Sequence, residues 1–374
     1  MTTFFLNRLA TEPHALAFAG QSTPWPVALA DQTTDPSLDE ALRGHVAAAG
    51  RLLTPVAADL LATTGRPVDL FGFAPNPARL GAAADATASV EGVALTQLGA
   101  LLDLEHLGYS VAQAKPLAVL GHSQGVLAVH MTRAIEAAGS IEAAGTTLDE
   151  ILAVAALIGA AGTRRVRELG LNPKYGEASP MLSVKGATRA QVEALVARVN
   201  NARGPISIAV TNSDNHHVLS GYPEDLAAFA LEAEREHQHQ AKLREQKLHG
   251  GTVFNPTLEY LEVTLPFHSP LMTDAVEQTV AWAGACGFDQ KRTRALAEEV
   301  LLNHVDWNAR VKALFDDADP SKLWIVDLGP GNTLGKLIGN VVQGTGIGVV
   351  EATTLAERCL LYTSDAADDS LRVD

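Results

Sequence analysis

The chain has 374 residues, of which 47% are apolar and 19% are charged. This composition is typical of folded globular proteins and excludes a disordered chain. The length allows either one large domain with a smaller inserted one or two domains. The 28 basic and 43 acidic residues give a formal net charge of -15, so we expect no global attraction to nucleic acid or to an anionic membrane.

The two cysteines, Cys286 and Cys359, are too few for a disulfide framework and match no metal-binding spacing. The first nine residues lack the apolar core of a signal peptide, and no run of 18 apolar residues follows. We therefore expect a cytoplasmic protein with no metal site, no bound cofactor and no membrane span.

The first elements of the chain follow from hydrophobic periodicity. Residues 15–19 form a short apolar run, which predicts a strand that leads into a proline-stiffened loop. Apolar residues recur at helical spacing over 39–61 and 89–107, which predicts two core helices. A turn is predicted between them, at the Pro-Asn-Pro sequence of 75–77.

The next motif is Gly-His-Ser-Gln-Gly at 121–125, which lies between a predicted buried strand at 116–120 and a predicted helix at 126–138. In this context the G-x-S-x-G pattern is typical of a nucleophile elbow, because the two glycines allow a sharp turn that exposes the serine hydroxyl above the sheet. The helix start adds free N–H groups and a positive dipole end where an oxyanion would form. Ser123 is therefore the candidate nucleophile.

The chain after the elbow changes character. Small residues at 139–147 predict a loop, and 148–169 predict a second helix that is apolar at first and basic at its end. The strands that follow are predicted at 181–184, 206–211, 217–220 and 258–265, with helices at 190–200 and 224–237.

This β-α-β-β-α-β order is that of a ferredoxin-like unit. We therefore expect an α/β fold. A hydrolase-like large subdomain with the nucleophile elbow, residues 1–180 and 265–358, is expected to carry an inserted ferredoxin-like small subdomain, residues 181–264.

Several histidines are candidates for site residues. Residues 232–249 are rich in charged and amide side chains and include His237 and His239, but residues two apart do not share a helix face, so a solvated helix and loop is expected. His216 and His217 fall in a predicted turn and are interpreted in the same way. His268, in Pro-Phe-His-Ser-Pro at 266–270, differs because it lies at a strand-to-helix junction, where loops on a rigid scaffold carry chemistry.

The last part of the chain contains a strand at 324–328, a Gly-Pro-Gly-Asn sequence at 329–332, a helix at 333–342 and a strand at 348–353. The glycine turn is interpreted as a tight packing turn, because its spacing matches no phosphate-binding fingerprint. Residues 359–374 resemble translated sequencing-adapter read-through and are expected to be a non-native tail.

Four motifs now stand in one order: Phe-Ala-Gly-Gln at 18–21, the elbow at 121–125, Pro-Phe-His-Ser-Pro at 266–270 and Asp-Leu-Gly-Pro-Gly at 327–331. This set resembles the acyl-CoA:acyl-carrier-protein transacylases of fatty acid and polyketide synthesis. The glutamine after the nucleophile, Val-Asp-Trp at 305–307 and Gly-Thr-Gly at 344–346 are similar to the acetyltransferase domain of type I fatty acid synthases.

The resemblance implies a ping-pong transfer of an acyl group from CoA to the phosphopantetheine thiol of an acyl carrier protein, within a multifunctional synthase. It implies Ser123 as nucleophile and His268 as its base, a dyad in which a backbone carbonyl from 300–303 orients the histidine. Backbone N–H groups of Gln21 and Gln124 would form the oxyanion hole. The remaining expected substrate-binding residues are Ile158, His122 and Asn303.

One position separates acetyl from malonyl specificity in the family. Malonyl transferases place an arginine on the helix after the elbow, where it holds the malonyl carboxylate in a bidentate pair. Alignment puts Ile158 there, which favours acetyl because an unpaired buried carboxylate is costly. Arg164 or Arg165 would serve a malonyl transferase instead, and these arginines, Arg167 and Lys185 are candidates for the CoA phosphates.

Two further alternatives are a serine esterase of the α/β-hydrolase type and a catalytically silent docking fragment of a larger synthase. A hydrolase would have an acid before the histidine in chain order and its second oxyanion donor on a glycine-rich loop. No such loop is evident, and a ferredoxin-like insertion before the histidine is foreign to that family. A departure from the family also concerns the oxyanion loop, where Ser22 replaces a glycine. If that position requires a positive φ, serine costs about 1 kcal/mol or more.

Overall fold

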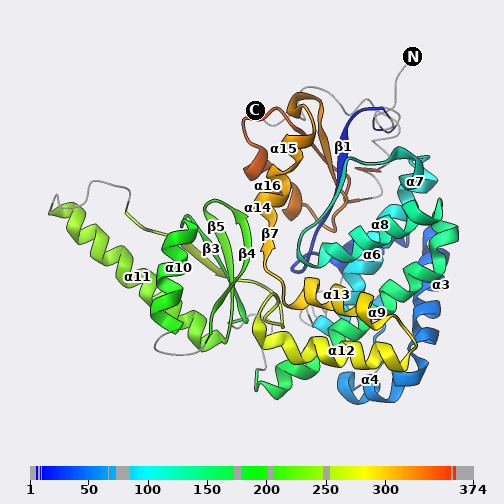
Figure 1. The fold of residues 1–374 in the computed structure, drawn as a ribbon, viewed down its shortest axis with the longest axis horizontal. Helices are drawn as coiled ribbons and strands as arrows, with labels where there is room; N and C mark the ends of the chain where they lie inside the picture. Colours follow the sequence, from blue (N-terminus) through cyan, green and yellow to red (C-terminus); the bar gives the residue numbers. More distant parts are fainter. Residues whose placement is uncertain are drawn as a thin grey trace.

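The computed structural model describes residues 6, 9, 11–65, 67–72, 85–171, 178–200, 205–246, 253–354 and 357–358. The predicted turn at 75–77 and the tail at 359–374 lie outside the described residues. A large α/β part and a smaller part lie next to each other along the long axis of the molecule (Figure 1). The smaller part corresponds to the segment between the second and third sequence motifs.

The sheet of the large part has four parallel strands in the order β2-β1-β8-β9. Their bounds are His14–Phe18 for β1, Ala118–Gly121 for β2, Trp324–Asp327 for β8 and Gly348–Glu351 for β9. Because parallel strands point the same way, the carboxyl ends of β1, β2 and β8 lie at one edge of the sheet. Three of the four sequence motifs begin at that edge, although up to 300 or so residues of chain separate them.

Helices form the rest of the large part (Figure 1). They are α2 Trp25–Gln32, α3 Pro36–Leu52, α4 Ala57–Thr64, α6 Ala86–His106, α7 Val111–Ala114, α8 Val126–Ala138, α9 Ile141–Glu168, α12 Thr273–Ala285, α13 Gln290–Leu301, α14 Trp307–Lys312, α15 Leu314–Asp317 and α16 Thr333–Val342. By length and composition α9 could cross a membrane. It packs instead against α3, α6, α8 and α12, so these helices cover its apolar surface.

Two predictions for this part were wrong. The helix predicted at 39–61 is two helices, α3 and α4, with a bend of 56° between them. The break lies at Thr54 and Pro55, because a proline restricts the residue before it and cannot donate to the preceding turn. The loop predicted at 139–147 is mostly helical, since Gly139 ends α8 with a φ of 84° and Ser140 Oγ accepts from the N–H of Ala143 to begin α9.

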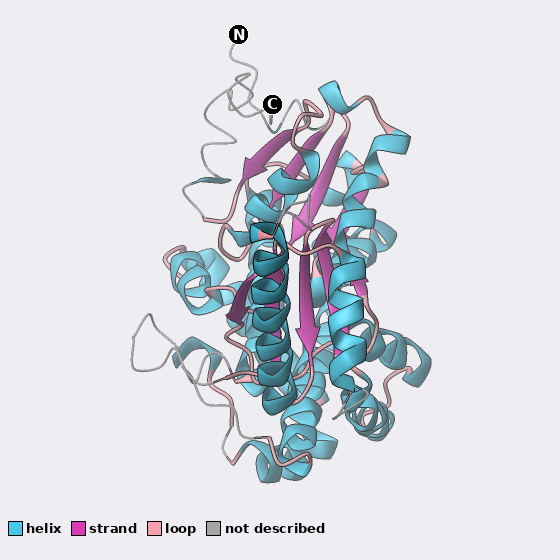
Figure 2. Cartoon of the chain, turned by 90° about the vertical axis from the view of Figure 1, so that its left-hand side faces the viewer, coloured by secondary structure: helices cyan, strands magenta, loops and turns pink. Residues whose placement is uncertain are grey.

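The smaller part has the expected ferredoxin-like order of elements. They are β3 Met181–Lys185, α10 Arg189–Asn200, β4 Ser207–Ser213, β5 His216–Ser220, α11 Pro223–Glu245 and β6 Thr257–Tyr260. The strands pair in the order β6-β3-β5-β4, all antiparallel, and α10 and α11 cover one face of this sheet (Figure 2). A separate group of buried apolar residues, including Leu182, Leu195 and Phe229, forms its core. The predicted fold class is confirmed.

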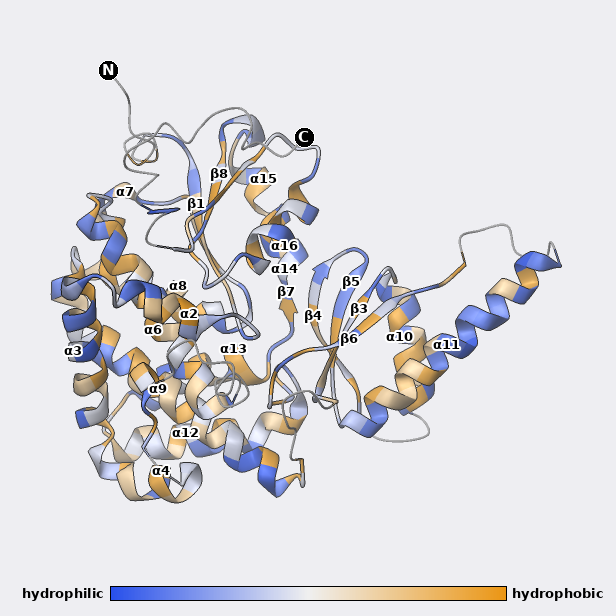
Figure 3. Ribbon diagram, turned by 180° about the vertical axis from the view of Figure 1, so that it is seen from behind, coloured by the Kyte–Doolittle hydropathy of each residue, from blue (hydrophilic) through white to orange (hydrophobic). Residues whose placement is uncertain are grey.

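Several details of the smaller part differ from the prediction. The last strand ends at Tyr260 rather than at residue 265, and α11 continues to Glu245, where its polar end extends away from the sheet (Figure 3). A fifth strand, β7 Val305–Asp306, pairs parallel to β4 although it lies beyond the expected insertion at 181–264. His216 and His217 belong to β5 and not to a turn, and His217 is fully buried.

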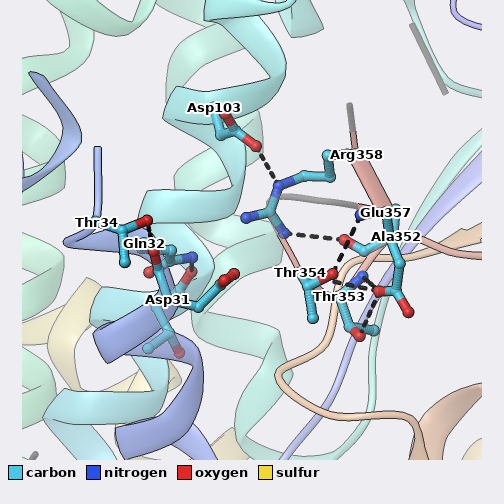
Figure 4. A network of polar contacts seen from close by, with 10 residues as sticks. Asp31, Gln32, Thr34, Asp103, Ala352, Thr353, Thr354, Glu357 and Arg358 are labelled. Carbon is cyan, nitrogen blue, oxygen red and sulfur yellow. Dashed lines mark hydrogen bonds and ion pairs between the residues drawn. The ribbon is translucent and has the colours of Figure 1, made fainter. Parts of the chain in front are cut away.

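The described chain ends with a buried polar network that fixes the end of β9 to α6 (Figure 4). The Glu357 carboxylate accepts from the N–H and hydroxyl of Thr353 at 2.8 Å, which holds the short turn after the strand. Arg358 is fully buried, donates to the Asp103 carboxylate and donates at 3.0 Å to the Ala352 carbonyl. A guanidinium buried in this way depends on its carboxylate partner.

We predict that Asp103→Asn lowers the free energy of unfolding by about 3–5 kcal/mol, because it leaves the Arg358 charge buried without a counter-ion. Urea unfolding followed by circular dichroism measures the change. The double variant Asp103→Leu with Arg358→Met removes both charges and is expected to lose less stability than the single variant. A loss below 1 kcal/mol in Asp103→Asn, within the range of exposed pairs, would contradict the buried ion pair.

Candidate active site

The turn after β2 forces Ser123 into an unusual backbone conformation. Ser123 has a φ of 52°, and its side chain is 8% exposed. A Cβ on Gly121 would lie 2.4 Å from the nitrogen of Val126, and one on Gly125 would lie 2.2 Å from the carbonyl oxygen of Phe18. Both positions therefore require glycine, and the turn has the geometry of a nucleophile elbow.

The Ser123 hydroxyl lies next to His268, 145 residues further along the chain. Ser123 Oγ is 2.7 Å from His268 Nε2, and His268 Nδ1 is 2.8 Å from the backbone carbonyl oxygen of Asn303. A carbonyl only accepts hydrogen bonds, so Nδ1 carries the proton and Nε2 is free to accept the serine proton. Among the expected residues 300–303, the structure thus places Asn303 at the orienting position.

Burial controls the protonation state of this histidine. Desolvation lowers the pKa of His268 to about 3, and the nearby His122, His304 and Arg310 add to the effect, while the bond to Asn303 opposes it. Desolvation also lowers the pKa of His122. Both imidazoles are therefore neutral at physiological pH, which is the state that a general base needs before the reaction.

Side chains from two other segments, β4 and α14, contact the elbow. His122 Nε2 is 2.7 Å from Oδ1 of Asn212 in β4, and the His122 ring meets the Trp307 ring edge to face at 5.3 Å between centroids. Arg310 donates to the Gly121 carbonyl at 3.0 Å. Sequence reasoning did not find Asn212 or Arg310, because only the packing of β4 and α14 against the elbow brings them there.

A cavity of about 420 Å³ opens above Ser123, between the two parts of the molecule. His122, Ser123 and Gln21 line it from the large part, and Asn212 and His216 line it from the smaller part. His216 Nε2 is 3.0 Å from Ser183 Oγ, and desolvation lowers the pKa of His216 to about 4. The histidine that the sequence assigned to a solvated turn is thus a neutral wall residue of the cavity.

The charges at the cavity come from three described side chains. Lys185 is the one cation among the described lining residues, and its Nζ lies 3.1 Å from the Glu259 carboxylate. Glu262 adds a second carboxylate. The described lining is therefore net acidic. Ile158 does not line the cavity, because it is fully buried within α9, and the exposed Asn303 contributes its carbonyl to His268 rather than a side chain to the cavity.

The loop after β1 lies against the elbow, and one of its residues, Ser22, has a positive φ. Ser22 has a φ of 61°, so serine occupies a position that favours glycine. The strain costs about 1 kcal/mol. Ser22, Gln21 and Ser123 all line the cavity, so this strained loop borders the same space as the Ser123 side chain.

The glycine turn after β8 has a structural role. The buried Asp327 carboxylate accepts from the N–H of Gly329 at 2.9 Å and from the N–H of Gly335 at 2.7 Å. Desolvation raises the pKa of Asp327 to about 7. Because this carboxyl occupies the start of α16, the turn offers no open cradle for a phosphate, in agreement with the interpretation as a packing turn.

Solved structures similar to this fold include malonyl-CoA:acyl-carrier-protein transacylases. The malonyl-CoA:acyl-carrier-protein transacylase of Coxiella burnetii is 16% identical, with a TM-score of 0.63 over 94% of this chain and 97% of that one. A malonyl transacylase solved in complex with its type II polyketide acyl carrier protein is also 16% identical, with a TM-score of 0.64 over 94% and 99%. The chain therefore has the α/β fold of these transacylases, with a large and a small subdomain.

Sequence comparisons narrow this class. The family model of the fatty acid synthase central AT domain matches residues 180–260. The fatty acid synthase β-subunit TOXC of Cochliobolus carbonum is 26% identical over 270 residues, and the β-subunit of Saccharomyces cerevisiae is 28% identical over 217. These matches cover 62% and 51% of this chain but only 12% and 10% of the relatives. Together they support an acyltransferase domain of a fatty acid synthase.

The low pKa of His268 makes a testable prediction about pH. Protonation of Nε2 would inactivate His268 as a base, and the pKa of His268 is about 3. With His268 as the base, the rate constant for acylation of Ser123 should therefore stay level between pH 5 and pH 8. An exposed histidine would instead give an inflection near its ordinary value of about 6.5. Rapid-quench acylation across this range measures the profile, and an inflection near 6.5 would contradict the buried, neutral base.

Proposed function

We propose that this chain transfers a short, uncharged acyl group, with acetyl favoured, from CoA to the phosphopantetheine thiol of an acyl carrier protein. The observation that carries the proposal is the geometry of Ser123, His268 and the Asn303 carbonyl beneath the cavity. The fold and the relatives described above support the transferase class. The proposal needs no metal and no bound cofactor, and it treats acetyl-CoA and the carrier protein as substrates.

The proposed reaction uses Ser123 and His268 in both half-reactions. His268 Nε2 takes the Ser123 proton as Oγ attacks the thioester carbonyl, and the backbone N–H groups of Gln21 and Gln124 stabilise the resulting oxyanion. The intermediate collapses to an acyl ester on Ser123, and His268 returns the proton to the departing CoA thiolate. The carrier-protein thiol then repeats the sequence in reverse and leaves with the acyl group.

The chemistry of the cavity supports an uncharged acyl group. A malonyl group would bring a free carboxylate next to Glu259 and Glu262, and Lys185 is already paired with one of them. Burying that carboxylate without a cation is unfavourable. The malonyl transacylases of similar fold make malonyl transfer the second candidate, and the two are separated by experiment.

The arginines that would serve a malonyl transferase have other partners. Arg164 Nε lies 3.0 Å from the Glu168 carboxylate, and Arg165 Nη1 lies 2.8 Å from the Asp274 carboxylate. Neither lines the cavity. Of the candidate CoA phosphate ligands, Arg167 donates to the Thr63 carbonyl, which leaves Lys185 as the candidate at the cavity mouth.

Brief mixing with acetyl-CoA or malonyl-CoA, followed by intact-protein mass spectrometry, tests the proposal. We expect an acetyl increment on the parent protein and none on Ser123→Ala. A malonyl increment in place of acetyl would assign the protein to the malonyl transferases. Cleavage of a simple ester with neither adduct would favour the hydrolase, and no reaction of any kind would favour a silent docking fragment.

A second prediction concerns the two arginines. Arg164→Ala and Arg165→Ala should leave acyl loading within about twofold of the parent, because neither side chain lies at the cavity. Mass spectrometry of the loaded enzyme with each CoA ester measures the effect. A loss confined to malonyl loading would instead show that these arginines hold a carboxylate.

A further inference from the structure

The proposed mechanism gives no role to the side chain of Gln124. Gln124 follows the nucleophile directly and is fully buried. Its Nε2 donates at 2.5 Å to the carbonyl oxygen of Val90 in α6, and its Oε1 accepts a hydrogen bond from Nε2 of Gln21. A buried amide thus joins a helix, the elbow and the loop after β1.

The direction of these hydrogen bonds is fixed by the backbone. The Val90 carbonyl can only accept, so it must face the NH₂ group of Gln124. The Gln124 oxygen is then left for the NH₂ group of Gln21. Gln21 and Gln124 are the two residues whose backbone N–H groups form the proposed oxyanion hole, so their side chains are joined to each other as well.

The loop that carries Gln21 needs such a connection. It runs so close to the elbow that a Cβ on Gly20 would lie 2.7 Å from the His122 carbonyl oxygen and 2.9 Å from Ser123 Cβ. The next residue after Gln21 is Ser22, which holds a strained φ of 61° at an exposed position. A strained backbone persists only where surrounding contacts hold it.

We infer that the Gln124 side chain is a positioning residue that sets the separation of the two oxyanion donors, by connecting Gln21 to the fixed carbonyl of Val90. The inference rests on the proposed function, because it assigns a task to the same oxyanion hole. Donors stabilise an oxyanion only when they are placed before the reaction. Loss of this side-chain connection allows the Gln21 loop to relax its strain and shift its N–H.

Gln124→Met tests the inference, since methionine has a similar length and removes both hydrogen bonds while the backbone N–H remains. We expect the acylation rate constant at saturating acetyl-CoA to fall about 10- to 100-fold, less than the roughly 10²- to 10³-fold loss for a deleted donor. The concentration of acetyl-CoA at half-maximal rate should change by less than about threefold, because the side chain does not line the cavity.

Gln21→Met provides the second half of a double-mutant cycle. It removes only the bond between the two side chains and lies at a partly exposed position, so it remains informative if Gln124→Met fails to fold. Because the two substitutions remove the same connection, the acylation rate constant of the double variant should be at most about threefold lower than that of the slower single variant. Fully multiplied losses, or a parent-like rate in Gln21→Met, would overturn the inference.

Gln32→Met is the matched control. Gln32 is another buried amide whose Nε2 donates at 2.8 Å to a carbonyl of α6, that of Thr96, but it does not contact the oxyanion loop. The acylation rate constant of the Gln32→Met variant should equal that of the parent protein. The two levels of failure are distinguishable: absence of an acyl adduct on the parent would contradict the proposed function, whereas normal loading of Gln124→Met would contradict only the role of its side chain.

Discussion

The close approach of two backbone segments at the carboxyl edge of the parallel sheet constrains the whole active site. The elbow after β2 meets the end of β1 and the loop after it at Gly20 and Gly125, where no Cβ can be accommodated. This contact places the loop that carries Gln21 directly beside Ser123. It also holds Ser22 and Ser123 at positive φ, so part of the folding free energy maintains a strained but prearranged site.

The second determinant of the site is removal of water. His268 is buried and stays neutral, and the carbonyl of Asn303 selects the tautomer that presents Nε2 to the Ser123 hydroxyl. A carboxylate at that position would place a buried charge beside Ser123, with the desolvation cost that such a charge carries. A carbonyl orients the ring without that cost. The arrangement therefore keeps a low-dielectric site in which the group that orients His268 is uncharged.

The smaller part of the molecule does more than enclose the cavity. Asn212 of β4 holds His122 directly, and β7, from the chain after the insertion, adds a strand to the sheet that carries Asn212. Trp307 and Arg310 follow that strand and contact the elbow from below. The pairing of β7 with β4 joins the two parts by backbone hydrogen bonds, and the contacts of Asn212, Trp307 and Arg310 join them at the elbow. The cavity walls and Ser123 therefore share one framework.

The sequence by itself determined the elements that depend on local pattern: the strand-turn-helix at Ser123, the order of the ferredoxin-like insertion and the helix at Thr333–Val342. Predictions from the sequence were wrong where the secondary-structure propensity of the residues is ambiguous. Residues 139–147 are mostly helical rather than a loop, and His216 and His217 belong to β5 rather than to a turn. Tertiary structure alone decided which carbonyl orients His268, which residues line the cavity, and how Gln124 connects to Val90. These contacts join segments far apart in the chain, and their energies depend on burial and distance, which only the folded arrangement defines.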